Sequence, residues 1–289
     1  MGFGGKLAGY AELVNASLRE ETQLDNGVVS EAMRYSLLSG GKRTRACLTL
    51  AVCDMLGGDR RSALLAADAI EMLHCYSLIH DDLPCMDDDD YRRGQPSCHK
   101  KYGEATAMLA GDALLTLAFR TLSRIEDAEI SRRCTALLSE AAGFNGMILG
   151  QELDLKGVDA GKEISAQLDR INENKTGKLI TVSLLMGAVC SGISSGDIYD
   201  ALERYGKGIG LVFQIVDDVL DVTSSLEELG KKTGSDEANS KLTYCSVYGA
   251  EGAMSRAEEI TAGCIEALGG IGDSEFLEWY ANDLLHRNK

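Results

Sequence analysis

Pro84 and Pro96 are the only prolines among the 289 residues, and both lie in one short stretch. Proline interrupts helices because it lacks a backbone N–H and clashes with the preceding turn. Long helices can therefore form elsewhere, and apolar residues recur at steps of three and four, as in residues 62–82. Alternating strand patterns with hairpin turns are absent. The sequence predicts an all-α fold, a single-domain bundle of long antiparallel helices around a central cavity, over residues 1–289.

Two further segments support this prediction. Residues 208–222 (GIGLVFQIVDDVLDV) are apolar nearly all round until the aspartates, which is typical of a helix in the middle of a bundle. Residues 179–196 are uncharged but contain Thr181, Ser183 and a Ser/Gly-rich end, so we expect a buried helix rather than a membrane span. The glycine pairs 40–41, 57–58 and 269–270 are expected to end helices.

Composition excludes several function classes. The 45 acidic residues outnumber the 29 basic ones, which gives a net charge of −16 and argues against nucleic acid and anionic membranes as partners. The nine cysteines form no CxxC pair and their number is odd, which favours free thiols in a reducing cytoplasm. The four histidines show no zinc-ligand spacing to them. The N-terminal residues lack the pattern of a signal peptide, so we expect a cytoplasmic protein.

The stretch after residue 80 concentrates negative charge, because six aspartates fall at positions 81, 82 and 87–90. Pro84 disfavours a continuing helix, which lets Asp87 approach Asp81 and Asp82 at a spacing that a straight helix would not offer. A solvated loop is the simplest alternative. An EF-hand loop is excluded, because Tyr91 stands where the third acidic residue should be.

A second acidic group, DDVLD, occupies residues 217–221. Asp217 and Asp221 are four residues apart, so on a helix they project from the same face. Two carboxylate groups facing one cavity would repel each other unless cations lay between them. Mg²⁺ resolves this, since it binds carboxylate and phosphate oxygens in octahedral geometry.

Cations follow in short, glycine-flanked patches. The patches are Arg92 and Arg93, then Lys42, Arg43 and Arg45 in GGKRTR, Lys175 and Lys178 in NKTGKL, and Lys231, Lys232 and Lys241 in residues 230–241. Arginine and lysine are the usual partners of phosphate, although many surface lysines are only solvated. Together with the acidic groups, the patches indicate two diphosphates, one held through Mg²⁺ and one held directly by cations.

These motifs resemble the trans-isoprenyl diphosphate synthases, and the bacterial farnesyl diphosphate synthases in particular. The resemblance covers nearly the whole chain. It rests on EAMRYSLLSGGKRTR, HCYSLIHDDLPCMDDDDYRRGQPSCH, AGDALLTLAF, GQELDL, KTGKLI, FQIVDDVLD, LGKKTGSD and the RNK end. It implies a Mg²⁺-dependent prenyltransferase that joins isopentenyl diphosphate head-to-tail to dimethylallyl and geranyl diphosphate, giving farnesyl diphosphate.

The resemblance also assigns residues. It implies that Asp81, Asp82, Asp87, Asp217, Asp218 and Asp221 bind Mg²⁺, about three ions per active site. Arg92, Lys175, Lys231 and Lys241 match positions that hold the allylic diphosphate, and Lys42, Arg45, His74 and Arg93 match the isopentenyl diphosphate site. Thr176, Gln214, Gln151 and Asp154 match groups that line the reacting carbons. The catalytic set is Asp81, Asp82, Asp87, Arg92, Lys175, Thr176, Asp217 and Lys231. A homodimer is implied as well.

Other residues near these motifs have simpler interpretations. A histidine such as His74 on an apolar helix is more often a core residue, and only the resemblance makes it a ligand. His80 is interpreted as structural, and Asp88 to Asp90 as support or solvated loop. Ala46 stands where the family often has proline, which could loosen the loop that carries Arg45 without removing charge.

Product length is predicted from the helix before Asp81. Tyr76 lies five residues upstream, about 7.5 Å along a helix, with the small Ser77 beside it. The resemblance makes this pair the floor of the tail pocket, although an aromatic residue at helical spacing is more often simply core. Farnesyl diphosphate is the predicted product, and geranylgeranyl diphosphate is the alternative.

Two rival functions use similar folds. A terpene cyclase would show one DDxxD motif and an Asn/Ser/Glu metal triad, whereas this chain has a second DDxxD. A catalytically silent partner subunit would be expected to lose aspartates or arginines, and this chain keeps them.

Overall fold

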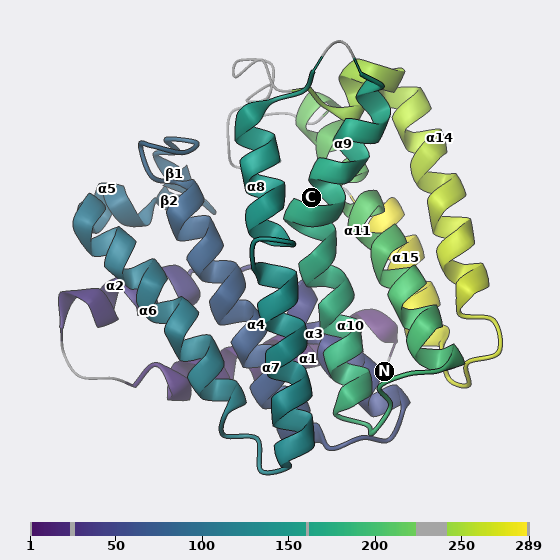
Figure 1. Ribbon diagram of the computed structural model, residues 1–289, viewed down its shortest axis with the longest axis horizontal. Coiled ribbons are helices and arrows are strands. Elements are labelled where there is room, and N and C mark those ends of the chain that lie inside the picture. Colours follow the sequence, from purple (N-terminus) through teal and green to yellow (C-terminus); the bar gives the residue numbers. More distant parts are fainter. Residues whose placement is uncertain (1, 24–26, 160–161, 224–241, 288–289) are drawn as a thin grey trace. The chain divides into compact units, whose positions relative to one another are not determined.

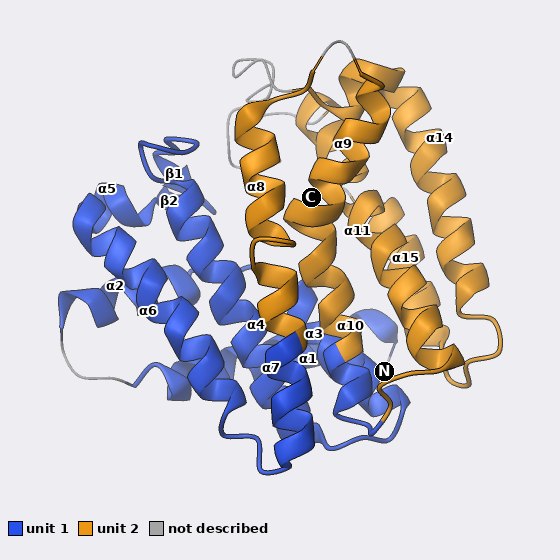
Figure 2. Cartoon of the chain, in the orientation of Figure 1, with its two compact units in different colours: residues 1–136, 186–192 blue, residues 137–185, 193–289 orange. Residues whose placement is uncertain are grey.

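A computed structural model describes residues 2–23, 27–159, 162–223 and 242–287. Its internal contacts divide the chain into two compact units (Figure 2). Unit 1 comprises residues 1–136 and 186–192, and unit 2 comprises residues 137–185 and 193–289. Both are helical, as predicted (Figure 1).

Unit 1 is built around α4 (Arg60–Asp81), which packs against α3 (Thr44–Met55) and α6 (Glu104–Leu122). Its other helices are α1 (Phe3–Glu21), α2 (Val28–Leu37), α5 (Cys98–Tyr102) and the first part of α7 (Ala128–Ala142). Helix α3 is buried almost all round. Helices α3 and α4 therefore form the core of this unit.

Helix α4 shows how the sequence sets these boundaries. It begins after Asp59, whose side chain accepts hydrogen bonds from the backbone N–H groups of Arg61 and Ser62 at 3.2 and 3.1 Å. Such an N-cap contributes about 1 kcal/mol to helix stability. The helix ends at Asp81, three residues before Pro84. The predicted helix over residues 62–82 is confirmed to within two residues.

Unit 1 also contains one small feature that the sequence analysis did not identify. Strands β1 (Tyr91–Arg92) and β2 (Gln95–Pro96) form a small antiparallel hairpin, although no hairpin was expected. Its two turn residues, Arg93 and Gly94, both have positive φ, 54° and 74°. Such turns match the twist of paired strands, so turn conformation rather than alternating hydrophobicity makes this hairpin.

Unit 2 is built around α11 (Asp197–Thr223), which packs against α14 (Tyr244–Ala267) and α15 (Glu275–Leu285). It also contains the end of α7, α8 (Met147–Lys156), α9 (Ile164–Asn172), the π-helix η1 (Glu173–Gly177) and most of α10 (Lys178–Val189). The predicted helix over 208–222 lies inside α11 and packs in the middle of this unit. The predicted helix over 179–196 is α10, which ends earlier, at Val189.

The predicted helix stops are confirmed where glycines adopt positive φ. Gly40, Gly57 and Gly270 follow the ends of α2, α3 and α14 with φ of 94°, 67° and 93°. Other residues adopt this conformation only at a cost. All nine cysteines lie in the described residues and are free thiols.

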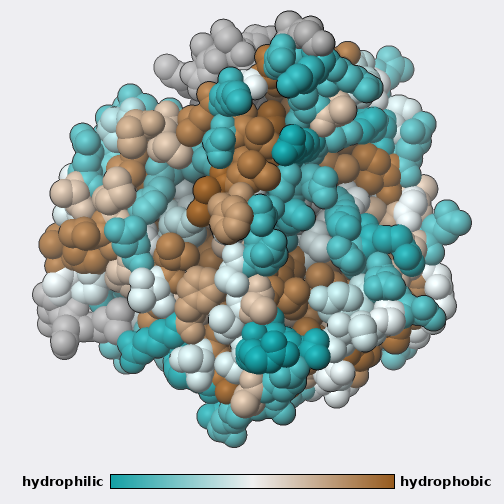
Figure 3. All heavy atoms as spheres, in the orientation of Figure 1, coloured by the Kyte–Doolittle hydropathy of each residue, from teal (hydrophilic) through white to brown (hydrophobic). Residues whose placement is uncertain are grey.

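The surface carries some hydrophobic side chains (Figure 3). On α6, Met108 is 42% and Leu109 is 54% exposed. Among the described helices, α4 and α6 are long and apolar enough to cross a membrane by length and composition alone. In α4 72% of that stretch is buried inside the structure, and in α6 44%. Helix α4 is thus a core helix.

Candidate functional site

The first acidic group lies at the C-terminal end of α4 in unit 1. After Asp82 the chain turns back, and the backbone N–H of Asp87 donates to the carbonyl oxygen of Asp81 at 2.9 Å. The N–H of Asp88 donates to the carbonyl of Leu83 at 3.2 Å. The turn at Pro84 therefore brings Asp87 beside Asp81, as the sequence predicted.

Asp82 has a different environment from Asp81 and Asp87. It is 2% exposed, whereas the other two are partly exposed. Arg92 donates to Asp82 Oδ1 from Nε at 3.0 Å and also from Nη2, and it reaches Asp89 at 3.2 Å. Burial raises the pKa of Asp82, and the ion pair with Arg92 opposes that rise. Asp82 thus anchors Arg92 beside the acidic group.

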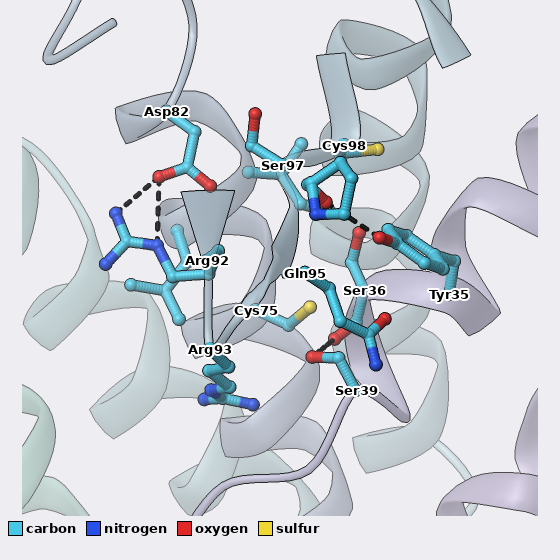
Figure 4. A pocket seen from close by; sticks show the side chains of 13 residues that line it. Tyr35, Ser36, Ser39, Cys75, Asp82, Arg92, Arg93, Gln95, Ser97 and Cys98 are labelled. Atoms are coloured by element: carbon cyan, nitrogen blue, oxygen red, sulfur yellow. Dashed lines mark hydrogen bonds and ion pairs between the residues drawn. The ribbon is translucent and has the colours of Figure 1, made fainter. Parts of the chain in front are cut away.

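The hairpin turn separates Arg92 from Arg93 (Figure 4). The guanidinium of Arg92 reaches Asp82, whereas Arg93 Nη1 donates to the carbonyl of Gly40 in the GGKRTR loop. A small pocket of about 30 Å³ lies between these residues, α2 and α4. As it stands, this space has room for water molecules but not for a diphosphate.

The GGKRTR loop divides its cations between solvent and core. Lys42 is exposed. Arg43 is 4% exposed, and it donates to Asn15 Oδ1 at 2.9 Å and forms an ion pair with Glu71 at 3.3 Å. Arg43 therefore stabilises the fold. Arg45, the second residue of α3, is also buried at 8% exposed, so Lys42 is the exposed cation of this motif.

His74 lies among the arginines of unit 1. Desolvation lowers the pKa of His74 well below its ordinary value, and the positive charges of Arg45 and Arg93 lower it further. The imidazole is therefore neutral at physiological pH. Three of the residues predicted to hold isopentenyl diphosphate, His74, Arg45 and Arg93, are thus near neighbours in this unit.

Tyr76 and His80 occupy the side of α4 that faces α6. Tyr76 is 7% exposed, and its ring lies edge-on to that of His80 with centroids 5.5 Å apart. His80 Nε2 lies 3.0 Å from the carbonyl oxygen of Met108 on α6. The structural interpretation of His80 agrees with this contact. The hydroxyl of Ser77 donates a hydrogen bond to the carbonyl oxygen of His74 at 2.8 Å.

In unit 2, the KTG motif forms the π-helix η1, an irregularity that is frequent at functional sites. The π-helix packs closely against α8, because a Cβ added at Gly150 of α8 would lie 2.1 Å from the backbone nitrogen of Lys175. Lys175 Nζ forms an ion pair with Asp154 at 2.6 Å. Two predicted site residues from separate helices are thereby brought together.

A hydrogen-bond chain links η1 to the second acidic group. Thr176 Oγ1 donates to Gln214 Oε1 at 3.4 Å, and Gln214 Nε2 donates to Asp218 Oδ1 at 2.9 Å. Asp218 Oδ2 accepts from the backbone N–H of Tyr244 at 2.8 Å. Asp218 is 5% exposed, so it fixes the start of α14 and the amide of Gln214.

Asp217 is paired with a residue that the sequence analysis did not assign. Arg287 Nη2 lies 2.6 Å from Asp217 Oδ1 and 2.9 Å from the carbonyl oxygen of Phe213, and the guanidinium stacks 4.3 Å from the ring of Phe213. The basic RNK end was the signal that could have suggested this cation.

Four other predicted residues complete the account, and one of them, Asp221, is 5% exposed on α11. The side-chain amide of Gln151 is buried, and neither its oxygen nor its nitrogen has a hydrogen-bond partner in the described structure. Such an amide is costly unless a further group satisfies it. Lys231 and Lys241 lie outside the described residues.

Comparison with known proteins identifies the chain. A sequence model of the polyprenyl synthetase family matches residues 26–267. The chain belongs to this family. Polyprenyl synthetases are prenyltransferases, and this chain is one of them.

Two curated relatives and one solved structure illustrate the likeness. The large subunit 1 of a heterodimeric geranylgeranyl pyrophosphate synthase from Arabidopsis thaliana is 43% identical over 269 residues, 90% of this chain and 72% of the relative. A farnesyl diphosphate synthase from Micrococcus luteus is 45% identical over 243 residues, 84% of this chain and 83% of the relative. The structure of a geranyltransferase from Helicobacter pylori, complexed with magnesium and isoprenyl diphosphate, superimposes with a TM-score of 0.85 at 35% identity. That superposition covers 99% of this chain and 97% of the other, so the polyprenyl synthetase fold is shown.

Proposed function

We propose that this polyprenyl synthetase transfers an allylic prenyl group head-to-tail to isopentenyl diphosphate. The observation that carries the proposal is the turn at Pro84, which sets Asp87 beside Asp81 while Arg92 is held against Asp82. Within one loop, this arrangement places carboxylate oxygens that can bind a metal ion next to an arginine that can bind a phosphate.

The carboxylates fit Mg²⁺. Asp81, Asp87 and Asp217 are partly exposed and offer hard oxygen ligands without nitrogen or sulfur, the donor set that Mg²⁺ prefers. We propose these three and Asp221 as its ligands, with about three ions in all. The resemblance also assigned Asp82 and Asp218 to the metal, but their oxygens accept hydrogen bonds from Arg92, Gln214 and Tyr244, so we propose them as positioning residues. When bound, Mg²⁺ neutralises charge on the departing diphosphate, and the magnesium named with the Helicobacter pylori geranyltransferase supports this assignment.

The remaining residues bind and orient the two substrates. Arg92 and Lys175 hold the allylic diphosphate and stabilise its charge as the C–O bond breaks. Lys42, Arg45, His74 and Arg93 hold isopentenyl diphosphate, and the neutral His74 can donate one hydrogen bond without adding charge. Oxygens of Thr176, Gln214 and Gln151 face the positive carbon chain, and the unpaired side-chain oxygen of Gln151 stabilises its charge.

The decisive experiment measures diphosphate release from dimethylallyl and isopentenyl diphosphates, with and without Mg²⁺. We expect release that requires both substrates and stops when the metal is chelated. No release with the purified chain, but release after addition of a second subunit, would support the silent-partner alternative instead. The large-subunit relative from Arabidopsis thaliana makes this control necessary.

Farnesyl diphosphate is the proposed product, and geranylgeranyl diphosphate the alternative. Relatives named for each product have similar identity to this chain, 45% and 43%. The buried ring of Tyr76, one and a half turns before Asp81, favours the shorter product because it closes the helix face along which a tail would grow.

The product proposal is tested by Tyr76→Ala. The variant should shift the products from fifteen to twenty or more carbons, measured by chromatography after dephosphorylation. Tyr102→Ala on α5, a matched control, should leave the profile unchanged. An unchanged fifteen-carbon profile in Tyr76→Ala would place the floor elsewhere.

We also propose a homodimer in a reducing cytoplasm. The exposed Met108 and Leu109 on α6 offer an apolar face for a second copy, and the nine free thiols suit a reducing compartment. Light scattering should report about twice the chain mass of 31.0 kDa. A monomer at micromolar concentration would contradict the dimer.

A further inference from the structure

A second group of possible metal ligands lies beside the first acidic group. One carboxylate oxygen each of Asp88 and Asp90 and one ring nitrogen of His99 lie within 4.8 Å of one another. Asp88 and Asp90 belong to the loop between α4 and β1, and His99 is the second residue of α5. None of the three belongs to the proposed Mg²⁺ or diphosphate sites.

His99 is the residue that distinguishes this group from an ordinary solvated acidic loop. Its side chain is enclosed, because the residue is only 5% exposed. Nδ1 lies 3.0 Å from Ser97 Oγ, whereas Nε2 is buried and has no hydrogen-bond partner among the described residues. When Nδ1–H donates to Ser97, Nε2 carries the lone pair that a metal ion requires.

A metal ion at this group would replace Lys100 as the cation that pairs with Asp90. Asp89, which lies between Asp88 and Asp90 in the sequence, forms an ion pair with Arg92 at 3.2 Å. Asp90 forms an ion pair with Lys100 through Oδ1 at 2.6 Å, but the Lys100 side chain is 42% exposed and can move into solvent. The backbone N–H of Ser97 donates to the carbonyl of Asp90 at 2.8 Å, which fixes the loop next to α5.

We propose that Asp88, Asp90 and His99 bind one divalent transition-metal ion such as Mn²⁺, separate from the catalytic Mg²⁺. Bonds of about 2.1 Å require the three ligand atoms to lie within about 4.2 Å of one another. Because Asp88 and Asp90 are exposed, small rotations of their side chains achieve this. An imidazole nitrogen together with two carboxylates favours a transition metal over Mg²⁺, which prefers oxygen alone.

Such an ion would have a positioning role. It would tie the loop that carries Asp87 to the buried imidazole of α5, and so hold Asp87 next to Asp81. The ion would not touch the substrates, and this proposal does not depend on the reaction assigned above.

Mn²⁺ itself is the probe, used with the full chain without substrates and in a large excess of Mg²⁺. Electron paramagnetic resonance of the free ion counts the Mn²⁺ that remains bound. Electron spin echo modulation then detects a directly bound imidazole nitrogen. We expect one retained Mn²⁺ per chain, with nitrogen coupling.

Variants of the exposed ligands avoid the risk that a change at the buried His99 prevents folding. Asp88→Asn combined with Asp90→Asn should weaken Mn²⁺ binding by about tenfold or more and remove the nitrogen coupling. Glu104→Gln is the matched control, because Glu104 is also exposed and acts on Lys100 but lies outside the group. Asp81→Ala combined with Asp217→Ala should keep the ion.

Three results would each overturn the proposal. They are complete loss of Mn²⁺ from the unaltered chain in excess Mg²⁺, bound Mn²⁺ without nitrogen coupling, and undiminished binding with nitrogen coupling in the Asp88/Asp90 variant.

Discussion

The two acidic groups contain the same number of predicted metal ligands but hold them in different ways. In unit 1, Asp81 and Asp87 meet because the chain turns back after α4. In unit 2, Asp217 and Asp221 lie one turn apart inside the continuous helix α11. The first group depends on a loop conformation and the second on helical geometry alone.

The supporting contacts differ in the same way. Arg92 lies ten residues from Asp82 and donates to it twice, through a single oxygen. Asp218 accepts hydrogen bonds at both of its oxygens, from Gln214 and from the backbone of Tyr244. Unit 1 therefore supports its acidic group with charge from the loop that follows, whereas unit 2 uses an amide of the same helix and a backbone N–H from the start of α14.

The largest expected effect tests whether the two groups are equally necessary. Asp81→Ala and Asp217→Ala should each lower turnover on the order of a hundred- to a thousandfold, because each removes a proposed ligand of the Mg²⁺ that would neutralise developing charge. Steady-state diphosphate release in saturating Mg²⁺ measures this. Glu203→Ala on α11 serves as the control. Near-normal turnover in either aspartate variant would remove that group from catalysis.

The next effect tests the division of cations between substrates. Arg45→Ala should raise the apparent KM for isopentenyl diphosphate about ten- to a hundredfold, because a charge-assisted hydrogen bond contributes about 1.5–3 kcal/mol. The KM for the allylic substrate should change much less. Equal changes in both constants would mean that the loop is assigned to the wrong diphosphate.

A smaller effect concerns stability. Asp82→Ala and Asp218→Ala should each lower the free energy of unfolding by about 1–3 kcal/mol, because Arg92 loses its buried acceptor in the first variant and the buried N–H of Tyr244 loses its acceptor in the second. Asp82→Asn should recover more of the lost free energy than Asp218→Asn does. At position 82 one oxygen accepts both hydrogen bonds, so the asparagine oxygen can replace it, whereas at position 218 two oxygens are used. Urea unfolding of the four variants tests this. Equal recovery at both positions would contradict the contrast.

The smallest effect concerns Arg287. Arg287→Ala should lower the Mg²⁺ concentration for half-maximal rate about two- to fivefold, because a partly exposed ion pair that competes for Asp217 is worth up to about 1 kcal/mol. Arg204→Ala, an exposed arginine of α11, should leave this concentration unchanged. A higher Mg²⁺ requirement in Arg287→Ala would show that Arg287 assists metal binding.

The GGKRTR loop illustrates what sequence reasoning could not decide. All three of its cations fit the phosphate-binding pattern, but Arg43 is used by Asn15 and Glu71. At the position where the family often has proline, the backbone N–H of Ala46 donates to Glu71 at 3.4 Å. Proline has no N–H to donate, so this chain ties the start of α3 to α4 through a bond that the family residue would lack.

The sequence by itself determined the helical class and the helices that carry each acidic group. It also determined that the chain turns back at Pro84 and brings Asp87 beside Asp81. These features depend on residue spacing and on proline, which act over a few residues. Only the tertiary structure decided which charged groups serve the fold. Arg43 with Glu71, Arg287 with Asp217 and Asp218 with Tyr244 are pairs far apart in the chain. The free energy of such contacts depends on burial and on distances in space, and neither is encoded in local spacing.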